Sequence, residues 1–555
     1  MKKNIIFLIS FTFAFTSLFA QSIEKGAEAI QMSSIKAQLS ILAADWMEGR
    51  ESGTKGELMA GDYIASMLQL YGIEPFGDTE YAPVRRQEWM AGKRPVERRT
   101  YFQQFNLIKY RIDADKQSLS IIEGNTNANV AKSYLYGVDY LLLNVENNLE
   151  FTAPVVFVGY GINDSPNGYN DFAKLDVRGK IIARIDGFPG SADTSSEGYK
   201  KFKYENIRKL KEQWAKDAGA IAVINLSRSS DKQFMMPTNL DFYFKRENFE
   251  SDVPMKRFGD YRARLASDIA NETLPEIRLS TVLQQSLLQK GGIDITEFVN
   301  QTGKSLKPAS RVIPAFSVKV TSGIESELVA VRNVLGCIEG KNKNEYIVVG
   351  AHYDHVGKYN GQVYNGADDN ASGTVGVLEI AKAIQASGIK PDKSIIFAAW
   401  TAEERGLYGS QYFVNKSIPN EKILFNLNMD MISRSSERDS TKKQFEFEFT
   451  KKYKGFQSLA EVLAKDMNLN LEPRFSPSEQ PMGGSDFSPF SEKGLPIISL
   501  FAGMHSDYHQ PSDEISKIDW NKMEQIIKLA YGITFSIANQ PVEHFIATEN
   551  EMEKK

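Results

Sequence analysis

The chain has 555 residues, more than one hydrophobic core usually serves, so its length predicts two domains. Hydrophobic residues make up 42% of the chain and charged residues 25%, the balance of an ordinary globular protein rather than of a disordered or fibrous one. The net charge of −4 and the short basic clusters, which have acids nearby, argue against nucleic acid or an anionic membrane surface as a partner.

The first twenty residues have the pattern of a secretory signal peptide. Lys2 and Lys3 precede an apolar stretch that runs to Ala20, and polar residues follow it. We expect cleavage after residue 20 and export of the mature protein, either to the periplasm or out of the cell. An uncleaved membrane anchor is the alternative, but the stretch is short for a span and contains Ser and Thr. We therefore expect no stable membrane anchor after cleavage.

The segment from Ser34 to Phe76 has helical periodicity, with a Gly-rich break before a second helix predicted over residues 57–70. A polar, Arg-rich stretch follows over residues 77–99, and its composition predicts a long surface loop.

The middle of the chain, residues 134–299, has short β-type runs separated by Gly, Asn and Asp turns. A helix is predicted over 209–218, directly before a further strand. The segments that precede this helix, at 159–162, 169–172 and 175–180, resemble those of a protease-associated domain, a small β-rich module inserted in several peptidase families. We therefore predict an inserted domain at 134–299 and one discontinuous domain formed by 21–133 and 300–555.

From Val331 onward the predicted strands and helices alternate. Strands are predicted at 346–350, 394–399, 424–429 and 496–501, and helices at 370–386, 403–415, 456–467 and 520–538. Apolar strands joined by helices predict an α/β three-layer sandwich with a mostly parallel central sheet. The single cysteine, Cys337, lies in an apolar run, which favours a buried thiol over a nucleophile and excludes an intramolecular disulfide.

Imidazole and carboxylate side chains follow these strands where each strand ends. Four of the five histidines of the chain lie in or beside such segments. The candidates are His352, Asp354, Asp368, Glu403, Glu404, Asp430 and His509. Because ligands gather at the carboxyl ends of parallel strands, we expect these side chains to form one site. Mixed imidazole and carboxylate ligands suit Zn²⁺, with Mn²⁺ or Co²⁺ as substitutes, and two such ions roughly 3.5–4 Å apart would share a carboxylate and a water.

Each of these residues also has a plainer explanation when it is taken alone. A histidine after a strand is more often structural, and acidic pairs at a helix start usually cap the helix. Their joint occurrence at several strand ends favours a metal site. The roles of His355 and His505 stay open between lining a pocket and supporting the structure.

The chain is similar to the M28 family of co-catalytic zinc aminopeptidases, in the form that carries an inserted protease-associated domain. The matching segments occur in family order at 48–54, 350–354, 366–373, 402–410, 428–431 and 508–513. The resemblance implies a zinc exopeptidase-like fold and two Zn²⁺ per chain. Asp368 would bridge the two ions, His352 and Asp430 would complete one site, and Glu404 and His509 would complete the other.

The resemblance also implies the catalytic groups. Glu403 would be the general base and later the acid, and Asp354 would accept a hydrogen bond from the free ring nitrogen of His352. Asp513 would do the same for His509.

Two further expectations follow from the resemblance. The peptide bond between Asp368 and Asp369 would be cis. The Gly-rich loop at 483–487 would lie near the substrate, with Gly484 allowing a close approach of the backbone and Asp486 contacting the ligand.

The predicted activity is release of N-terminal residues from peptides. A carboxypeptidase or dipeptidase of the same fold, a glutaminyl cyclase-like enzyme and a non-catalytic receptor-like scaffold are the alternatives. The sequence does not indicate the preferred N-terminal residue, the role of the inserted domain or the oligomeric state.

Overall fold

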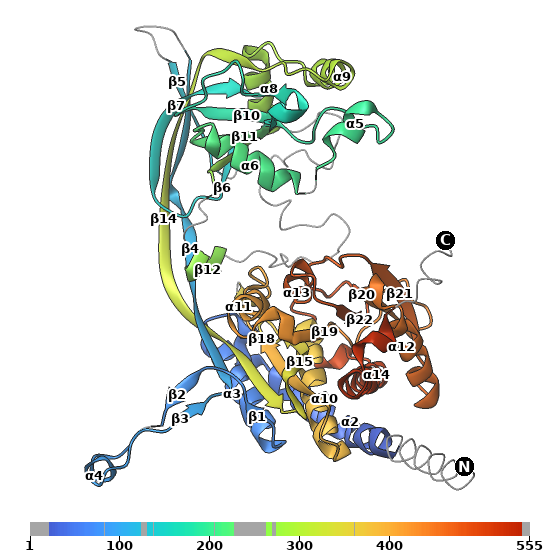
Figure 1. The fold of residues 1–555 in the computed structure, drawn as a ribbon. Coiled ribbons are helices and arrows are strands. Elements are labelled where there is room, and N and C mark those ends of the chain that lie inside the picture. Colours follow the sequence, from blue (N-terminus) through green and yellow to red (C-terminus); the bar gives the residue numbers. More distant parts are fainter. Residues whose placement is uncertain are drawn as a thin grey trace.

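The computed structural model describes residues 21–82, 84–123, 130–136, 138–204, 206–226, 262–268, 273–359 and 361–546. Two lobes are joined by a pair of long antiparallel strands, β4 (Phe102–Glu123) and β14 (Arg311–Ile338), which run from one lobe into the other (Figure 1). The predicted signal peptide, residues 1–20, lies outside the described residues.

The larger lobe is built on a mostly parallel sheet, as predicted. Its strands are β15 (Asn342–His352), β18 (Lys393–Trp400), β19 (Ile423–Asp430), β20 (Gln444–Thr450), β21 (Glu472–Ser478) and β22 (Ile497–Phe501). They lie in the order β21-β20-β22-β19-β15-β18, and β14 follows at the β18 side. Strands β18, β15, β19 and β22 are parallel, so their carboxyl ends meet at one edge.

Helices cover both faces of this sheet and make three layers. One face carries α2 (Met32–Leu42), α3 (Lys55–Leu70), α10 (Gly373–Ser387), α12 (Gly455–Asp466) and α14 (Trp520–Asn539). The other carries α11 (Tyr408–Lys416) and α13 (Ser488–Glu492). Because β15 is covered on both sides, its side chains are apolar on both. Val349 packs in the core under α10 and α14, and Val348 packs in the core under α11 and α13. This arrangement confirms the predicted α/β fold.

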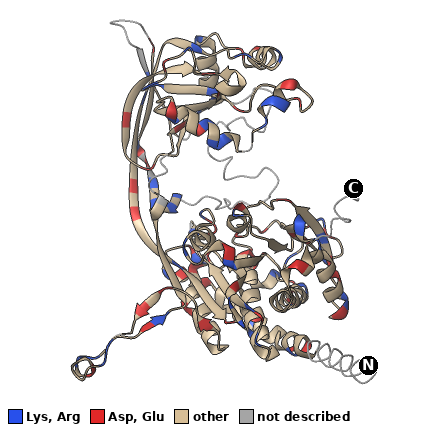
Figure 2. Ribbon diagram, in the orientation of Figure 1, with Lys and Arg blue, Asp and Glu red and all other residues tan. Residues whose placement is uncertain are grey.

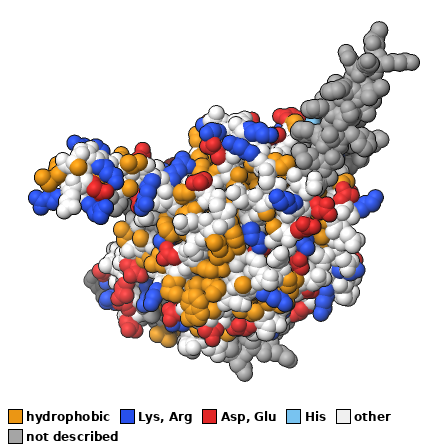
Figure 3. All heavy atoms as spheres, turned by 90° about the horizontal axis from the view of Figure 1, so that it is seen from below, with side chains coloured by type: hydrophobic (Ala, Val, Ile, Leu, Met, Phe, Trp, Pro, Cys, Tyr) orange, Lys and Arg blue, Asp and Glu red, His pale blue; other side chains and the backbone are white. Residues whose placement is uncertain are grey.

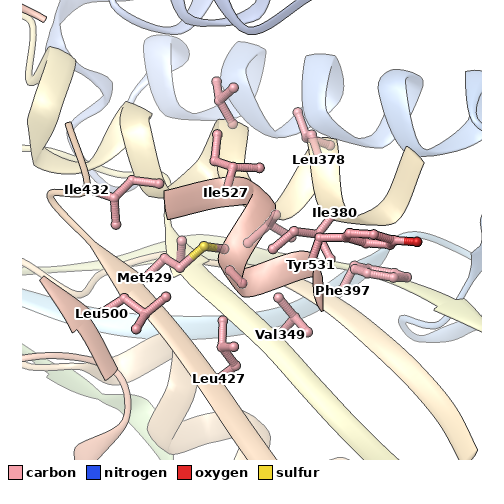
Figure 4. Close-up of a cluster of buried hydrophobic side chains, with 14 of the residues drawn as sticks. Val349, Leu378, Ile380, Phe397, Leu427, Met429, Ile432, Leu500, Ile527 and Tyr531 are labelled. Carbon is pink, nitrogen blue, oxygen red and sulfur yellow. The ribbon is translucent and has the colours of Figure 1, made fainter. Parts of the chain in front are cut away.

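The largest core lies between the sheet and α14. Ile527 and Tyr531 of α14 pack over Leu427 and Met429 of β19 (Figure 4). The helix begins at a capped end, where the Asp519 carboxylate accepts a hydrogen bond from the backbone N–H of Lys522 at 3.1 Å. This packing fixes β19, and therefore the position of the residue that ends it.

The smaller lobe has its own sheet and its own core. Strands β7 (Leu149–Phe157), β10 (Ile181–Ile185), β11 (Ala222–Leu226) and β13 (Glu276–Leu279) are parallel, and β6 (Tyr140–Leu143) pairs antiparallel at the edge. Helices α5 (Glu197–Phe202), α6 (Ile207–Asp217), α8 (Thr281–Lys290) and α9 (Ile295–Ser305) belong to the same lobe. Its core includes Leu119 of β4 and Val318 of β14, so it reaches beyond the predicted insertion 134–299 into both long strands.

Two local expectations from the sequence are wrong. The helix expected over 403–415 begins only at Tyr408, and Glu403 and Glu404 lie in the turn before it. The surface loop expected over 77–99 contains a short strand pair and a helical turn, described below.

Cys337 is buried at 6% exposure, and burial raises the pKa of its thiol to about 12, in agreement with the predicted buried thiol. Among the residues described, no helix combines the length and the apolar character that crossing a bilayer requires.

The fully buried ring of Phe447 on β20 contacts Phe445, Phe449 and Phe475 in the core on the α14 side of the sheet. Its substitution therefore tests how much that core stabilises the protein. Phe447→Ala should lower the free energy of unfolding by about 3–5 kcal/mol, because it removes buried apolar area and leaves a cavity. Urea denaturation followed by circular dichroism measures this. The matched control is Val462→Ala at a 54% exposed position of α12, and an equal loss of stability there would contradict the assignment.

Candidate metal centre

The histidines and carboxylates predicted from strand ends do converge at the carboxyl edge of the sheet. His352 ends β15 and Asp430 ends β19, while Glu403 and Glu404 lie in the turn after β18. His509 comes from the loop after β22, where its backbone has a φ of 54°. Because the strands are parallel and in register, residues distant in sequence meet here.

Asp369 lies between the two predicted histidine ligands. Its Oδ1 is 3.4 Å from His352 Nε2, and its Oδ2 is 3.1 Å from His509 Nε2. One carboxylate thus turns one oxygen to each side of the site, which is the arrangement that a carboxylate shared by two metal ions requires.

The donor atoms form two groups, and Asp369 belongs to the first of them and faces the second. One consists of His355, Asp369, Glu404 and His509, and the other of His352, Glu403 and Asp430. The ligand atoms within each group lie within 4.8 Å of one another. In the first group His509 Nε2 is 3.0 Å from Glu404 Oε2, and in the second His352 Nε2 is 3.5 Å from Asp430 Oδ1.

Several of these buried nitrogen and oxygen atoms lack a hydrogen-bond partner within the described part of the chain and are placed to bind a cation. His509 Nε2, His355 Nε2 and Asp369 Oδ2 make no hydrogen bond with any residue that the structure describes. Buried polar atoms normally have partners, and orphaned ones point to an unseen ion or water. Imidazole nitrogens and carboxylate oxygens at this spacing are the donor set of Zn²⁺ sites.

The prediction that Asp368 would bridge the metal ions is contradicted by its contacts. Asp368 Oδ1 accepts hydrogen bonds from the backbone N–H and the hydroxyl of Ser433, at 2.9 and 2.6 Å. Its Oδ2 lies 3.1 Å from His505 Nε2. The carboxylate therefore faces Ser433 and His505, and the central position belongs to Asp369. The cis peptide bond is likewise displaced by one residue and joins Asp369 to Asn370, not Asp368 to Asp369.

Asp513 also acts elsewhere than predicted. Its carboxylate accepts hydrogen bonds from the backbone N–H groups of Asp368, at 3.1 Å, and Asp369, at 3.0 Å, rather than from the ring of His509. Burial raises the pKa of Asp513 to about 7. Asp513 thus holds the turn that presents Asp369.

Asp354 supports His352 mainly through its backbone. The Asp354 carbonyl lies 3.1 Å from His352 Nδ1, while its carboxylate is 3.8 Å away. That carboxylate instead accepts hydrogen bonds from the Ser52 hydroxyl at 2.8 Å and from the backbone N–H of Glu403 at 3.1 Å. Asp354 therefore connects His352 to the turn that carries Glu403.

The adjacent glutamates have opposite pKa shifts. Burial raises the pKa of Glu403 well above its usual value; the charge of His352 opposes this, and the nearby carboxylates add to it. Burial also disfavours a charge on Glu404, but the charge of His509 and the hydrogen bonds with His355 and His509 together outweigh it and lower the pKa to about 2. Pairs of carboxyl groups with pKa values held apart are typical of sites where one group moves a proton and the other stays charged.

His355, whose role the sequence did not decide, belongs to the first group of candidate metal-binding side chains. Its Nδ1 lies 2.8 Å from Glu404 Oε1, and its ring packs edge-on against His509 with centroids 5.4 Å apart. The ring is fully buried. The one available signal was its position three residues after His352, which could not tell a ligand from a core histidine.

The two weaker substrate candidates lie in different environments. Asp486 is buried, its Oδ1 accepts a hydrogen bond from the Ser410 hydroxyl, and burial raises its pKa to about 7. Gly484 is exposed, and a Cβ added there would meet no atom within 4 Å. Between them, Ser485 donates a hydrogen bond to Asp430 Oδ2 at 2.6 Å, so this loop also positions a donor of the second group.

The fully buried Arg50 guanidinium, which the sequence did not single out, ties two loops to the end of α2. It donates to the carbonyls of Tyr353 at 2.8 Å, Asn365 at 2.6 Å and Gly366 at 3.0 Å, and also to that of Leu42. Burial lowers the pKa of Arg50 to about 10, although nearby carboxylates oppose the shift, so it remains charged at neutral pH. The loops that carry His352 and Asp369 thus share one support.

Residues 333–534 match the profile of Peptidase family M28, and this segment contains every donor of the two groups. This part of the chain belongs to peptidase family M28. The predicted M28 family is therefore confirmed for residues 333–534, which run from β14 to α14, and the predicted protease-associated domain lies outside this match.

Relatives of known name match part of this chain. Leupeptin-inactivating enzyme 1 of Streptomyces exfoliatus is 31% identical over 193 residues, which are 33% of this chain and 38% of that enzyme. Aminopeptidase YwaD of Bacillus subtilis is 28% identical over 253 residues, which are 42% of this chain and 50% of that protein. The chain thus spans half or less of the length of these curated relatives.

One solved structure, an aminopeptidase from Aneurinibacillus sp. strain AM-1, aligns over 94% of this chain and 97% of its own length. The TM-score is 0.55 and the sequence identity 18%, so the two share a fold across both lobes.

Two aspartate variants separate Asp369 from Asp368 in this M28 domain. Asp369→Asn should lower the metal content of the purified protein, because it removes the charge that faces both His352 and His509. Asp368→Asn should retain the metal, because an amide oxygen still accepts from Ser433. Elemental analysis after dialysis gives the metal content. Loss of metal in the Asp368 variant alone would restore the original assignment.

Proposed function

We propose that the protein is an exported aminopeptidase that hydrolyses the N-terminal peptide bond of peptides with two zinc ions and Glu403 as general base. The observation that carries this proposal is the pair of donor groups on either side of Asp369. Membership of the M28 family and the aminopeptidase names of relatives support it.

Asp369 is the shared ligand in this proposal. His352 and Asp430 hold one ion, and Glu404 and His509 hold the other, with Mn²⁺ or Co²⁺ as possible substitutes. Zinc in such a pair supplies an acidified water and polarises a carbonyl oxygen. His355 keeps Glu404 in place by its 2.8 Å contact.

Glu403 moves the proton in the proposed reaction. Its raised pKa favours accepting a proton from the attacking water as the new C–O bond forms. The same carboxyl group then delivers that proton to the leaving nitrogen as the C–N bond breaks. The backbone N–H of Glu403, bound to Asp354, fixes the turn that presents the carboxylate.

The loop at 483–487 forms one wall of the proposed substrate site. Asp486 Oδ2 makes no hydrogen bond with any residue that the structure describes, and in this proposal it contacts the substrate, while exposed Gly484 leaves room for the peptide backbone. In this proposal the smaller lobe is the protease-associated domain. Residues 1–20 are the signal peptide that directs the whole protein to export.

A small library of aminoacyl and peptide substrates tests the activity. Cleavage of substrates with a free N-terminus, and none with a blocked one, is the expected result. Release of C-terminal residues would make the protein a carboxypeptidase or dipeptidase, and cyclisation of N-terminal glutamine would make it a cyclase. No turnover of any substrate by metal-loaded protein would leave a receptor-like scaffold.

Glu403→Gln should lower kcat by about 10²–10⁴-fold, because the amide cannot accept and return the proton. Metal content should stay close to that of the unchanged protein. Elemental analysis and steady-state kinetics on the same preparation measure both effects. Full activity in this variant would remove Glu403 from the base role.

Removal of the metal should abolish hydrolysis. Dialysis against a chelator is expected to eliminate turnover, and stoichiometric Zn²⁺ to restore it, with two ions per chain at saturation. Titration of the metal-free protein followed by activity and by calorimetry determines the number. Activity that survives complete chelation would exclude the metal mechanism.

A further inference from the structure

A hairpin arm projects from the larger lobe, away from the smaller lobe (Figure 1). The arm comprises residues 79–99, with β2 (Thr79–Tyr81) and β3 (Glu97–Arg99) paired antiparallel and α4 (Arg86–Met90) at its tip. Backbone hydrogen bonds between Asp78 and Thr100 at 2.8 Å, and from Asp78 to Phe102 at 2.8 Å, fix its root to the body. The direction of the arm is therefore set by the fold of the larger lobe.

The arm has no core of its own. All six residues of its two strands are exposed. A two-stranded ribbon without a covered face is marginally stable in water, so a ribbon of this kind gains most from a surface that covers it.

The tip is nevertheless ordered. Glu88 accepts a hydrogen bond from the backbone N–H of Arg85 at 3.2 Å and pairs with Lys93 at 3.1 Å. The backbone N–H of Lys93 returns to the Glu88 carbonyl at 2.9 Å. These contacts close the tip into a fixed shape, which lowers the entropy lost when it docks.

Apolar side chains stand exposed along the whole arm. Tyr81 is 70% exposed, Trp89 55%, Met90 73% and Val96 64%. The Arg94 guanidinium lies 5.6 Å from the centre of the Trp89 ring. Aromatic residues, Met and Arg are the types enriched at the centres of protein interfaces, which favours a protein over a lipid as the partner.

The arm is cationic, whereas the rest of the chain is acidic. The arm has five Arg and one Lys against three Glu, while the remainder of the chain has 67 acidic and 60 basic residues. Figure 2 shows both signs along the arm, and Figure 3 shows hydrophobic and basic side chains over it. In that view the body carries a hydrophobic patch with acidic and basic side chains around it. The body thus offers apolar surface with acidic side chains within reach, and an overall acidic excess, to an arm that is apolar and cationic.

We propose that the arm docks on the body of a second copy of this chain and forms a two-fold dimer. In such a dimer each arm contacts the other body, so the interface is used twice. Each partner would contribute the 21 residues of its arm together with the body surface under the other arm, which is enough for the roughly 20–30 residues a side of a stable interface. No donor of the candidate metal centre belongs to the arm, so both sites remain complete.

Light scattering on a size-exclusion column tests the proposal with the full-length mature protein. The unchanged protein should have twice the mass of one chain over a wide range of protein concentrations. The double variant Trp89→Glu and Met90→Glu should have the mass of one chain, because two charges replace the exposed apolar groups of the tip. Val462→Glu, at a position of 54% exposure on α12, is the matched control and should remain a dimer.

Circular dichroism and hydrolysis of a chromogenic aminoacyl substrate show whether each variant is folded; neither signal should change. Where the substrate is not turned over, circular dichroism alone serves. A single-chain mass for the unchanged protein, or a dimer that persists in the arm variant, would overturn the proposal. Flotation of a monomeric protein with phosphatidylglycerol vesicles, lost in the arm variant, would also overturn it in favour of a lipid surface.

Discussion

The constraint that organises the larger lobe is the burial of many ionisable groups at one edge of the central sheet. His352, Asp369 and His509 are buried, and Glu404 is partly buried with a side chain that is 6% exposed. Burying a charge is costly unless it is paired or bound to a metal. The surrounding structure therefore has to supply charged or hydrogen-bonding partners for these groups.

These partners lie one layer beneath the donors. Arg50 supplies a fixed positive charge and joins the loops after β15 and before α10 through backbone carbonyls. Glu57 of α3 accepts hydrogen bonds from the hydroxyls of Tyr353 and Thr401, which neighbour His352 and Glu403, and burial raises its pKa to about 7. The N-terminal segment is thus part of the support of a site whose ligands all lie in the C-terminal half. This explains why the lobe is assembled from both ends of the chain.

The division of labour between Glu403 and Glu404 follows from their surroundings. Glu404 contacts two imidazoles, His355 and His509, and keeps its charge. Burial favours the neutral form of Glu403 by raising its pKa; His352, 3.8 Å away, opposes this, and the nearby carboxylates add to it. The two glutamates of this turn therefore differ in pKa, because the turn directs Glu404 to His355 and His509 and directs Glu403 to His352.

The sequence by itself determined the α/β class, the order of strands and helices in the larger lobe, and the strand ends at which ligands gather. These features depend on local periodicity and on residue type, both of which are visible in a single chain. The tertiary structure alone decided which of two adjacent aspartates faces the centre. Asp368 and Asp369 are chemically identical, and Ser433, His505 and Asp513, all distant in sequence, fix the turn between them. The contact of His355 with Glu404 and the exposure of the hairpin arm are also visible only there, because burial and exposure depend on how remote segments pack.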